Sequence, residues 1–251
     1  MAQHLFIVTG SSRGVGAALV EQLLQPGHIV LGIARHANAT LQARADAAGW
    51  RLEQWESDLG DPLPVADTLR RWLAAFDPAL LGSASLINNA GAIGGGAPLG
   101  RIPLPVLSNA LRVGLEAALL LCAAFLDVTA DWPGQRRVMN ISSGLGRRAM
   151  AGSAAYCAAK AGMDHLSRVL ALEQATLPNP ARVVAMAPGV IDTDMQSELR
   201  AMDPVAFPDR ERFVQLKAAG QLLSPQACAE QLLKRLHAPD FGTDAVADLR
   251  T

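Results

Sequence analysis

The sequence predicts an α/β fold in which a single doubly wound parallel sheet is flanked by helices on both faces. Short apolar segments rich in β-branched residues alternate with longer segments of helical periodicity along the whole chain. This alternation is typical of βαβ units, which have right-handed crossovers and parallel strands. The size agrees, because 251 residues, 50% of them hydrophobic, suit one large domain over residues 1–251 better than two small ones.

The first half of the chain contains three strand–helix pairs and a fourth strand. Each expected strand is a short apolar run, and each expected helix is a longer segment with apolar residues on one face. In chain order we expect a strand at 5–8, a helix at 15–24, a strand at 28–34, a helix at 40–48, a strand at 50–55, a helix at 64–75 and a strand at 85–87.

The second half repeats the pattern with longer helices. In chain order we expect a helix at 107–128, a strand at 137–141, a helix at 154–175, a strand at 181–187, a helix at 226–236 and a short strand at 245–249. Two long segments without a regular pattern, 91–100 and 189–221, follow strands at the edge where doubly wound sheets bind ligands. We expect both to be functional loops and the second to bind the substrate.

Composition limits the expected partners and location. The net charge of −1 gives no reason to expect nucleic acid or an anionic membrane surface as a partner. Three cysteines without close spacing and five scattered histidines argue against disulfides and against a metal site. The longest apolar run, 115–126, is too short to cross a bilayer, and the N-terminus lacks the features of a signal peptide. We therefore expect a soluble cytoplasmic protein.

A glycine-rich turn lies where the first strand meets the first helix. Residues 9–16 read Thr-Gly-Ser-Ser-Arg-Gly-Val-Gly, with the spacing G-x-x-x-G-x-G. Glycines here allow a tight turn and let backbone N–H groups approach a pyrophosphate at the helix N-terminus, as in a Rossmann-type fold. The alternative is an ordinary glycine-rich turn, which the preceding strand and the following helix disfavour. The expected cofactor-binding residues of this turn are Gly10, Ser12, Arg13, Gly14, Val15 and Gly16.

The charge at the end of the second strand favours NADP(H) over NAD(H). An NAD site usually places a carboxylate there to bind the ribose 2′-hydroxyl. This strand instead ends in Ala34-Arg35-His36, and Arg35 together with Arg13 can pair with a 2′-phosphate. The alternative is that both arginines are solvated surface charges.

The turns after the third and fourth strands complete the expected cofactor site. Asp58 and Leu59 follow the third strand, where the Asp58 carboxylate can accept a hydrogen bond from an adenine amino group. Asn89, Ala90 and Gly91 follow the fourth strand, where asparagine also favours the turn itself.

The spacing of Tyr156 and Lys160 predicts acid–base chemistry. Four residues apart on a helix, the two side chains share one face, and Tyr156 is the only tyrosine in the chain. A nearby cation favours the phenolate and lowers the pKa of a tyrosine, so that the phenol can exchange a proton near neutrality. By itself the spacing also occurs by accident on surface helices.

Taken together, these motifs resemble those of the short-chain dehydrogenase/reductase family over essentially the whole chain. The segments that carry the resemblance are 9–16, 58–59, 88–91, 140–143 (Asn-Ile-Ser-Ser), 156–160 and 188–193 (Pro-Gly-Val-Ile-Asp-Thr). Within the family, segments 192–196, 217–224 and 247–249 are similar to the sepiapterin reductase and benzil reductase branch.

The resemblance implies an NADPH-dependent carbonyl reductase that acts on a ketone or vicinal diketone of the sepiapterin or benzil type. Ser143 would hold the substrate carbonyl oxygen, and Tyr156 would donate the proton as hydride arrives. Lys160 would bind the nicotinamide ribose and lower the pKa of Tyr156. The residues that would frame the nicotinamide are Pro188, Gly189, Val190 and Thr193. Two alternatives remain: oxidation of a secondary alcohol, and a catalytically weak NADP(H)-binding regulator or scaffold.

One position departs from the family pattern. Where the family has an asparagine that anchors a proton-relay water near the lysine, this chain has Gly114. Asn109 lies five residues earlier, about 140° around a helix, so it is a poor replacement. We expect a weakened proton relay rather than an absent one.

Substrate contacts are expected in segment 189–221 and near the C-terminus. The resemblance implies that Asp248 holds the substrate, as a C-terminal aspartate does in the sepiapterin reductase branch; a surface acid is the alternative. Met195 either belongs to an adaptable apolar lid or packs in the core. Apolar residues on more than one face of helices 107–128 and 154–175 predict a homodimer, which can pair further into a tetramer.

Overall fold

In the computed structural model, which describes residues 2–250, seven parallel strands form one sheet in the order β3-β2-β1-β4-β5-β6-β7. The strands are β1 (Gln3–Thr9), β2 (His28–Ala34), β3 (Arg51–Glu56), β4 (Leu81–Asn88), β5 (Gln135–Ile141), β6 (Arg182–Ala187) and β7 (Val246–Asp248). The chain winds outward from β1 to β3, returns to β4 beside β1, and then winds outward the other way. The predicted doubly wound sheet is confirmed, and its strand order reverses between β1 and β4, where such sheets bind ligands.

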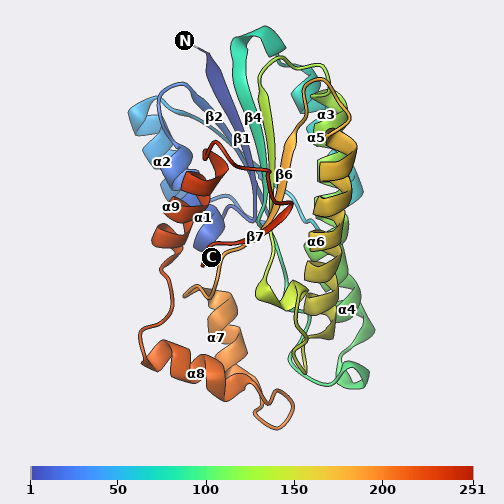
Figure 1. The fold of residues 1–251 in the computed structure, drawn as a ribbon. Helices are drawn as coiled ribbons and strands as arrows, with labels where there is room; N and C mark the ends of the chain where they lie inside the picture. Colours follow the sequence, from blue (N-terminus) through green and yellow to red (C-terminus); the bar gives the residue numbers. More distant parts are fainter. Residues whose placement is uncertain (1, 251) are drawn as a thin grey trace.

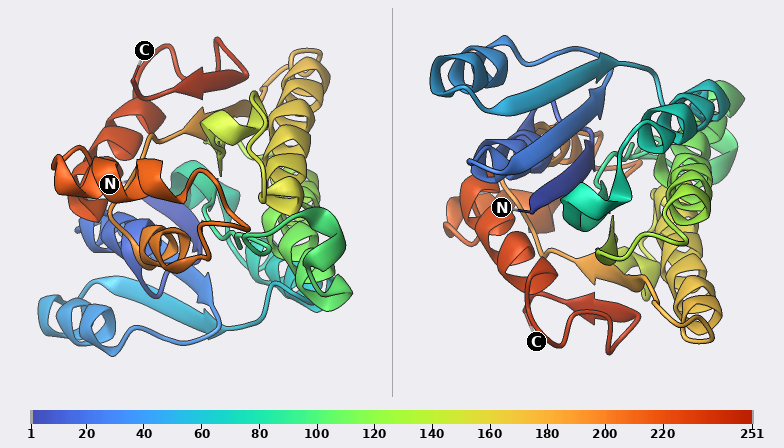
Figure 2. Two further views of the ribbon diagram at one scale, coloured as in Figure 1. Left: turned by 90° about the horizontal axis from the view of Figure 1, so that it is seen from below. Right: turned by 90° about the horizontal axis from the view of Figure 1, so that it is seen from above.

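Helices cover both faces of this sheet, as Figures 1 and 2 show. One face carries α1 (Gly14–Leu23), α2 (Ala39–Ala48) and α9 (Pro225–Leu236), and the other carries α3 (Pro62–Ala74), α4 (Leu104–Leu111), α5 (Ala117–Val128) and α6 (Ala154–Gln174). Two short helices, α7 (Asp194–Ala201) and α8 (Arg210–Ala218), lie beyond the carboxyl ends of the strands, below the sheet in Figure 1. Within residues 2–250, none of the helices has the length and apolar character needed to cross a membrane.

Each face of the sheet has its own hydrophobic core. In β1, Leu5 and Ile7 pack with apolar residues of α3 and α5, whereas Phe6 and Val8 pack with apolar residues of α1 and α9. All four side chains are at most 1% exposed. Side chains alternate along a strand, so a central parallel strand is buried on both faces and its sequence is a continuous apolar run.

The structure differs from the sequence-based expectation at β4. This strand spans Leu81–Asn88, whereas only 85–87 was expected. Gly82, Ser83 and Ser85 interrupt the apolar pattern, but β1 and β5 pair with the strand on both sides. Backbone pairing in the middle of the sheet thus overrides weak local propensity.

Two further differences concern helices. The expected single helix at 107–128 contains a π-helical turn, Arg112–Glu116, between α4 and α5. Segment 189–221, expected as a loop, contains α7 and α8. Only Gln196 and Leu199 in α7 and Phe213 in α8 are buried, so neither helix has enough apolar residues to produce a clear periodic pattern.

Candidate active site

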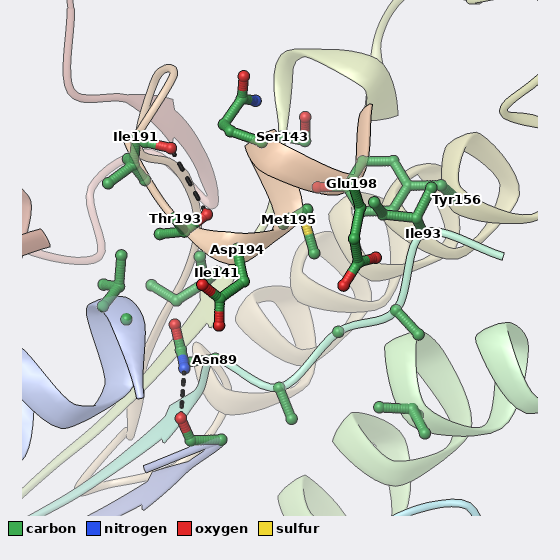
Figure 3. A pocket seen from close by; sticks show the side chains of 18 of the residues that line it. Asn89, Ile93, Ile141, Ser143, Tyr156, Ile191, Thr193, Asp194, Met195 and Glu198 are labelled. Carbon is green, nitrogen blue, oxygen red and sulfur yellow. Dashed lines mark hydrogen bonds between the residues drawn. The ribbon is translucent and has the colours of Figure 1, made fainter. Parts of the chain in front are cut away.

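A cavity of about 990 Å³ opens at the carboxyl edge of the sheet. It is lined by turns that follow the first six strands, by the first two turns of α6 and by α7 (Figure 3). The predicted site residues that line it are Gly10, Ser12, Arg13, Gly14, Val15, Arg35, Asp58, Leu59, Asn89, Ala90, Gly91, Ser143, Tyr156, Lys160, Pro188, Gly189, Val190, Thr193 and Met195. The fold therefore places nearly all of the predicted site residues around one cavity. Gly16 and Asp248 do not line it.

The glycine turn after β1 is held by the neighbouring strands. Gly10 has a φ of +67°, a conformation that favours glycine, and its N–H donates to the Ile33 carbonyl oxygen at 2.8 Å. Gly16 supports the turn from behind, because an added Cβ would fall on the Gly10 carbonyl oxygen. Arg13, at the start of α1, makes no side-chain cap, so the backbone N–H groups of the first turn remain available to an anion. The turn therefore fits a dinucleotide pyrophosphate.

Asn89 joins this turn to the one after β4. Its side-chain amide donates to the Thr9 carbonyl oxygen at 2.9 Å. In return, the Thr9 hydroxyl accepts hydrogen bonds from the backbone N–H groups of Asn89, at 2.9 Å, and Ala90, at 3.0 Å. The two turns on either side of the strand-order reversal are thus locked together.

The end of the cavity next to β2 and β3, where adenosine is expected, carries the predicted charges. Arg35 is exposed at the end of β2, and Asp58 accepts a hydrogen bond from the Gly60 N–H at 2.8 Å, which closes the turn after β3. Arg13 reaches across the cavity mouth instead, to an ion pair with Asp194 of α7 at 2.9 Å. The guanidinium group of Arg35 is therefore the better placed of the two for a 2′-phosphate.

Ser143, Tyr156 and Lys160 line the opposite end of the cavity. Ser143 follows β5, and its hydroxyl oxygen accepts a hydrogen bond from the Leu145 N–H at 3.2 Å. Ser142, the residue before it, donates a hydrogen bond to the buried Asp164 carboxylate. Tyr156 and Lys160 lie one turn apart on α6, and the Lys160 Nζ is 5.7 Å from the centroid of the Tyr156 ring.

Burial decides the pKa values of this pair. Lys160 is 4% exposed and donates to the Ile141 carbonyl oxygen at 2.6 Å; its burial lowers its pKa to about 8, against the opposing attraction of Asp164. Tyr156 is half-buried, and removal from water raises its pKa, although a hydrogen bond with Ser143 acts in the opposite direction. The expected lowering of the Tyr156 pKa by Lys160 is thus not seen, because desolvation dominates at the phenol and the ammonium group faces a carbonyl.

An ion pair behind Lys160, between the buried Asp164 and the exposed Arg147, was missed in the sequence. Asp164 is 1% exposed and accepts hydrogen bonds from Ser142 and from the Arg147 Nε, the latter at 3.1 Å. Arg147 also donates to the Ala247 carbonyl oxygen of β7 at 3.1 Å. Gly146 allows this close packing, because an added Cβ would lie 2.8 Å from the Lys160 carbonyl oxygen. The spacing of four residues between Lys160 and Asp164, which places both on one face of α6, is the available sequence signal.

Gly114 lies in the π-helical turn and packs directly against α6. It is buried, and an added Cβ would lie 3.1 Å from the Cβ of Ala159, the residue before Lys160. Asn109 is exposed and points toward the turn after β3, where its Oδ1 would be 2.8 Å from a Cβ added to Gly60. Asn109 is therefore directed away from Lys160, in agreement with its expected unsuitability as a replacement. Irregular π turns of this kind often occur at functional sites.

A small apolar cluster holds α7 and α8 over the substrate end of the cavity. Ile93, Leu199, Phe207 and Phe213 form its buried part, and Met195 packs against it while also lining the cavity. Both interpretations of Met195, as a lid residue and as a packing residue, are thus compatible with its position.

The prediction for Asp248 needs correction. Its side chain is only 12% exposed, and its carboxylate accepts hydrogen bonds from the Arg250 Nε at 2.8 Å and Nη2 at 2.6 Å. Arg250, rather than Asp248, lines the cavity. Asp248 ends β7 and Arg250 follows it by two residues, and the sequence does not indicate which of the two lines the cavity.

The fold and the site together define a Rossmann-type oxidoreductase, and the comparison with known families is specific. The sequence model of the short chain dehydrogenase family matches residues 4–204, so the chain belongs to this family. It is 32% identical to a benzil reductase ((S)-benzoin forming) from Bacillus cereus, over 94% of each chain. It is 34% identical to a sepiapterin reductase from Meriones unguiculatus, over 96% of this chain and 94% of the relative.

A solved structure carries a bound cofactor. It is a candidate 2-deoxy-d-gluconate 3-dehydrogenase from Agrobacterium tumefaciens with bound NADP. The chain superposes on it with a TM-score of 0.79 and 25% identity, over 99% of this chain and 95% of the other.

Proposed function

We propose that this protein is an NADPH-dependent carbonyl reductase whose substrate is a ketone or vicinal diketone of the benzil or sepiapterin type. The observation that carries the proposal is the convergence of Ser143, Tyr156 and Lys160 at one end of a cavity whose other end holds the glycine turn and Arg35. The family membership and the similarity to benzil and sepiapterin reductases support it.

NADPH, when bound, supplies the hydride. The glycine turn and the N-terminus of α1 would hold its pyrophosphate, and Arg35 would hold its 2′-phosphate. Pro188, Gly189 and Thr193, which follow β6, would frame the nicotinamide.

The chain's own residues then act on the carbonyl oxygen. The Ser143 hydroxyl donates a hydrogen bond that stabilises the negative charge developing on that oxygen. Because the pKa of Tyr156 is raised, its phenol stays protonated at neutral pH and donates the proton to the same oxygen. Lys160, whose Nζ donates to the Ile141 carbonyl oxygen, would bind the nicotinamide ribose.

We also propose a homodimer in the cytoplasm. Exposed leucine and valine side chains on α4, α5 and α6 form a surface suited to a second copy; they include Leu104, Leu111, Leu119, Val169 and Leu172. Cys122, Cys157 and Cys228 are free thiols, as is usual for a reducing compartment.

The test is NADPH consumption by the purified protein with benzil, sepiapterin, 1-phenyl-1,2-propanedione and a simple aliphatic ketone, each repeated with NADH. We expect turnover of an aromatic or vicinal dicarbonyl compound with NADPH and much slower turnover with NADH. Tight NADPH binding without turnover of any carbonyl compound would contradict the proposal and favour a regulator, for which Gly114 is the one structural argument.

A further inference from the structure

The C-terminal strand places an arginine at the substrate end of the cavity. Arg250 follows β7, and its Nε and Nη2 donate to the two carboxylate oxygens of Asp248 at 2.8 and 2.6 Å. The Arg250 backbone N–H donates to the same carboxylate at 3.0 Å. Two parallel charge-assisted hydrogen bonds fix the plane of a guanidinium group as well as its position. Asp248 is largely buried, so the anchor is firm, whereas the Arg250 side chain is 61% exposed.

The guanidinium group lies next to the residues that the proposed reaction uses. Its Nη2 is 3.8 Å from the position that a Cβ would take on Gly144, the residue after Ser143. The Cδ of Arg250 is 3.5 Å from the corresponding position on Gly189, beside the expected nicotinamide site. Both glycines line the cavity together with Arg250. An arginine has five N–H donors, and the pairing with Asp248 uses two of them. Among residues 2–250 the other three have no hydrogen-bond partner, so they are left for a ligand beside Ser143.

The charges around this arginine select for an acceptor oxygen rather than for a strongly anionic group. Asp248 compensates the charge of Arg250, and Glu198 of α7 lines the same cavity (Figure 3). A doubly negative substrate would share this cavity with the Glu198 carboxylate as well as with the Arg148 guanidinium group. A neutral carbonyl oxygen gains the hydrogen bond to a charged donor without that repulsion.

We propose that Arg250, positioned by Asp248, binds a second acceptor oxygen on the substrate, so that the protein prefers carbonyl compounds with a second carbonyl group near the reacting one. This inference rests on the proposed reductase function and narrows its substrate class to dicarbonyl compounds. It also assigns Asp248 the role of a positioning residue that acts through Arg250.

The experiment compares two substrates that differ only in the second carbonyl group: 1-phenyl-1,2-propanedione and propiophenone. In Arg250→Gln, kcat/KM for the dione falls about tenfold or more relative to the wild type, and kcat/KM for propiophenone changes less than about twofold. Asp248→Asn also lowers kcat/KM for the dione, mainly by raising KM, because the Arg250 guanidinium group loses the carboxylate that positions it. Comparing each variant with the wild type removes the difference in intrinsic reactivity between the two ketones.

Arg148→Gln is the matched control, since it also removes one exposed cation that lines the cavity. An equal loss of dione turnover in the Arg148 and Arg250 variants would reveal a general charge effect and overturn the proposal. So would an equal loss for both ketones in Arg250→Gln.

A binding measurement separates this proposal from the proposed function. The dissociation constants of the dione and of propiophenone are measured with the NADP⁺-saturated protein by calorimetry, in the wild type and in Arg250→Gln. If the wild type reduces no carbonyl compound, the reductase function fails, while a dione-specific loss of binding still supports the role of Arg250. Binding of both ketones that is unaffected by Arg250→Gln overturns it.

Discussion

At the cofactor end of the cavity the chain turns directly out of buried strands, whereas at the substrate end it leaves the sheet and runs through two short helices. The cofactor turns are tied to each other and to β2 by hydrogen bonds of Thr9, Gly10 and Asn89. The two ends of segment 189–221, the expected substrate-binding loop, are linked by a backbone hydrogen bond: the Leu223 N–H donates to the Val190 carbonyl oxygen at 3.0 Å. The segment between Val190 and Leu223, which contains α7 and α8, lies beyond the carboxyl ends of the strands (Figure 1).

The forces that hold the two ends differ accordingly. The glycine turn leads into α1, whose Val15 and Ala18 belong to one of the two main cores. By contrast, α7 and α8 rest on one small apolar cluster and on exposed ion pairs, Arg13 with Asp194 and Lys217 with Asp192. Exposed ion pairs contribute only about 0–1 kcal/mol each. We therefore expect the turns around Thr9, Gly10 and Asn89 to be the more rigid part, and α7 and α8 to undock before the rest of the protein unfolds.

The largest effect is expected at Tyr156, the proposed proton donor. Tyr156→Phe removes the proton donor, so kcat falls by about 10²–10⁴-fold. The NADPH dissociation constant, measured by fluorescence titration, stays within about twofold because the phenol is not needed for the pyrophosphate or 2′-phosphate contacts. Loss of turnover and of NADPH binding together would mean that Tyr156 is structural.

The next effect concerns the cofactor end alone. Arg35→Gln removes a charged partner of the 2′-phosphate, and the loss of about 1.5–3 kcal/mol raises KM for NADPH about 10- to 100-fold. KM for NADH stays constant, which the same assay checks. Arg44→Gln, which removes another exposed arginine, one paired with Glu21, serves as the control. Equal changes for both cofactors would contradict the assignment of Arg35.

A matched pair of core substitutions tests the loosely held lid. Phe207→Ala empties the centre of the lid cluster, where Phe207 is fully buried and stacked on Phe213. We expect KM for the carbonyl substrate to rise about tenfold while Tm changes little, because the lid undocks before the whole protein unfolds. Phe125→Ala, in the main core, should instead cost about 3–5 kcal/mol and lower Tm strongly. Similar Tm losses in both variants would show that the lid is no separate unit.

The pH dependence of activity tests the interaction between Lys160 and Asp164. The charged form of Lys160 is the active one, so kcat/KM should fall as the pH rises through its pKa of about 8. Asp164 favours the ammonium form, and Asp164→Asn therefore moves this alkaline limb to lower pH. A pH–rate profile measures the shift, with Asp127→Asn on the surface of α5 as the control. An alkaline limb that stays in place would rule out this role.

The smallest effect is expected at Gly114. Gly114→Asn restores the polar group of the family pattern, so kcat should rise a few-fold if relay of protons limits turnover. The added Cβ presses on Ala159, which costs about 1–3 kcal/mol of stability. Gly114→Ala carries the same packing cost without the amide and separates the two contributions. An unchanged kcat in Gly114→Asn would argue against a relay at this position.

Most of the cofactor end could be predicted from the sequence because its determinants are local. The glycine turn, the missing carboxylate after β2 and the spacing of Tyr156 and Lys160 each lie within a few residues of one strand or helix. A backbone turn or a helical face follows from such short segments, whatever the rest of the chain does. The pattern of strands and helices was predictable for the same reason, except where polar residues hid β4 and where α7 and α8 had few buried residues.

The sequence by itself thus determined the doubly wound sheet, the family and the residues around the cavity. The tertiary structure decided what those residues do to each other: Lys160 faces the Ile141 carbonyl, Asp164 is joined to Arg147 of a distant turn, and Arg250 rather than Asp248 reaches the substrate end. These outcomes depend on burial and on contacts between segments up to 100 residues apart in the sequence. A local pattern contains no information about such contacts, because the direction of a side chain and the pKa of a buried group are set by neighbours that only folding brings together.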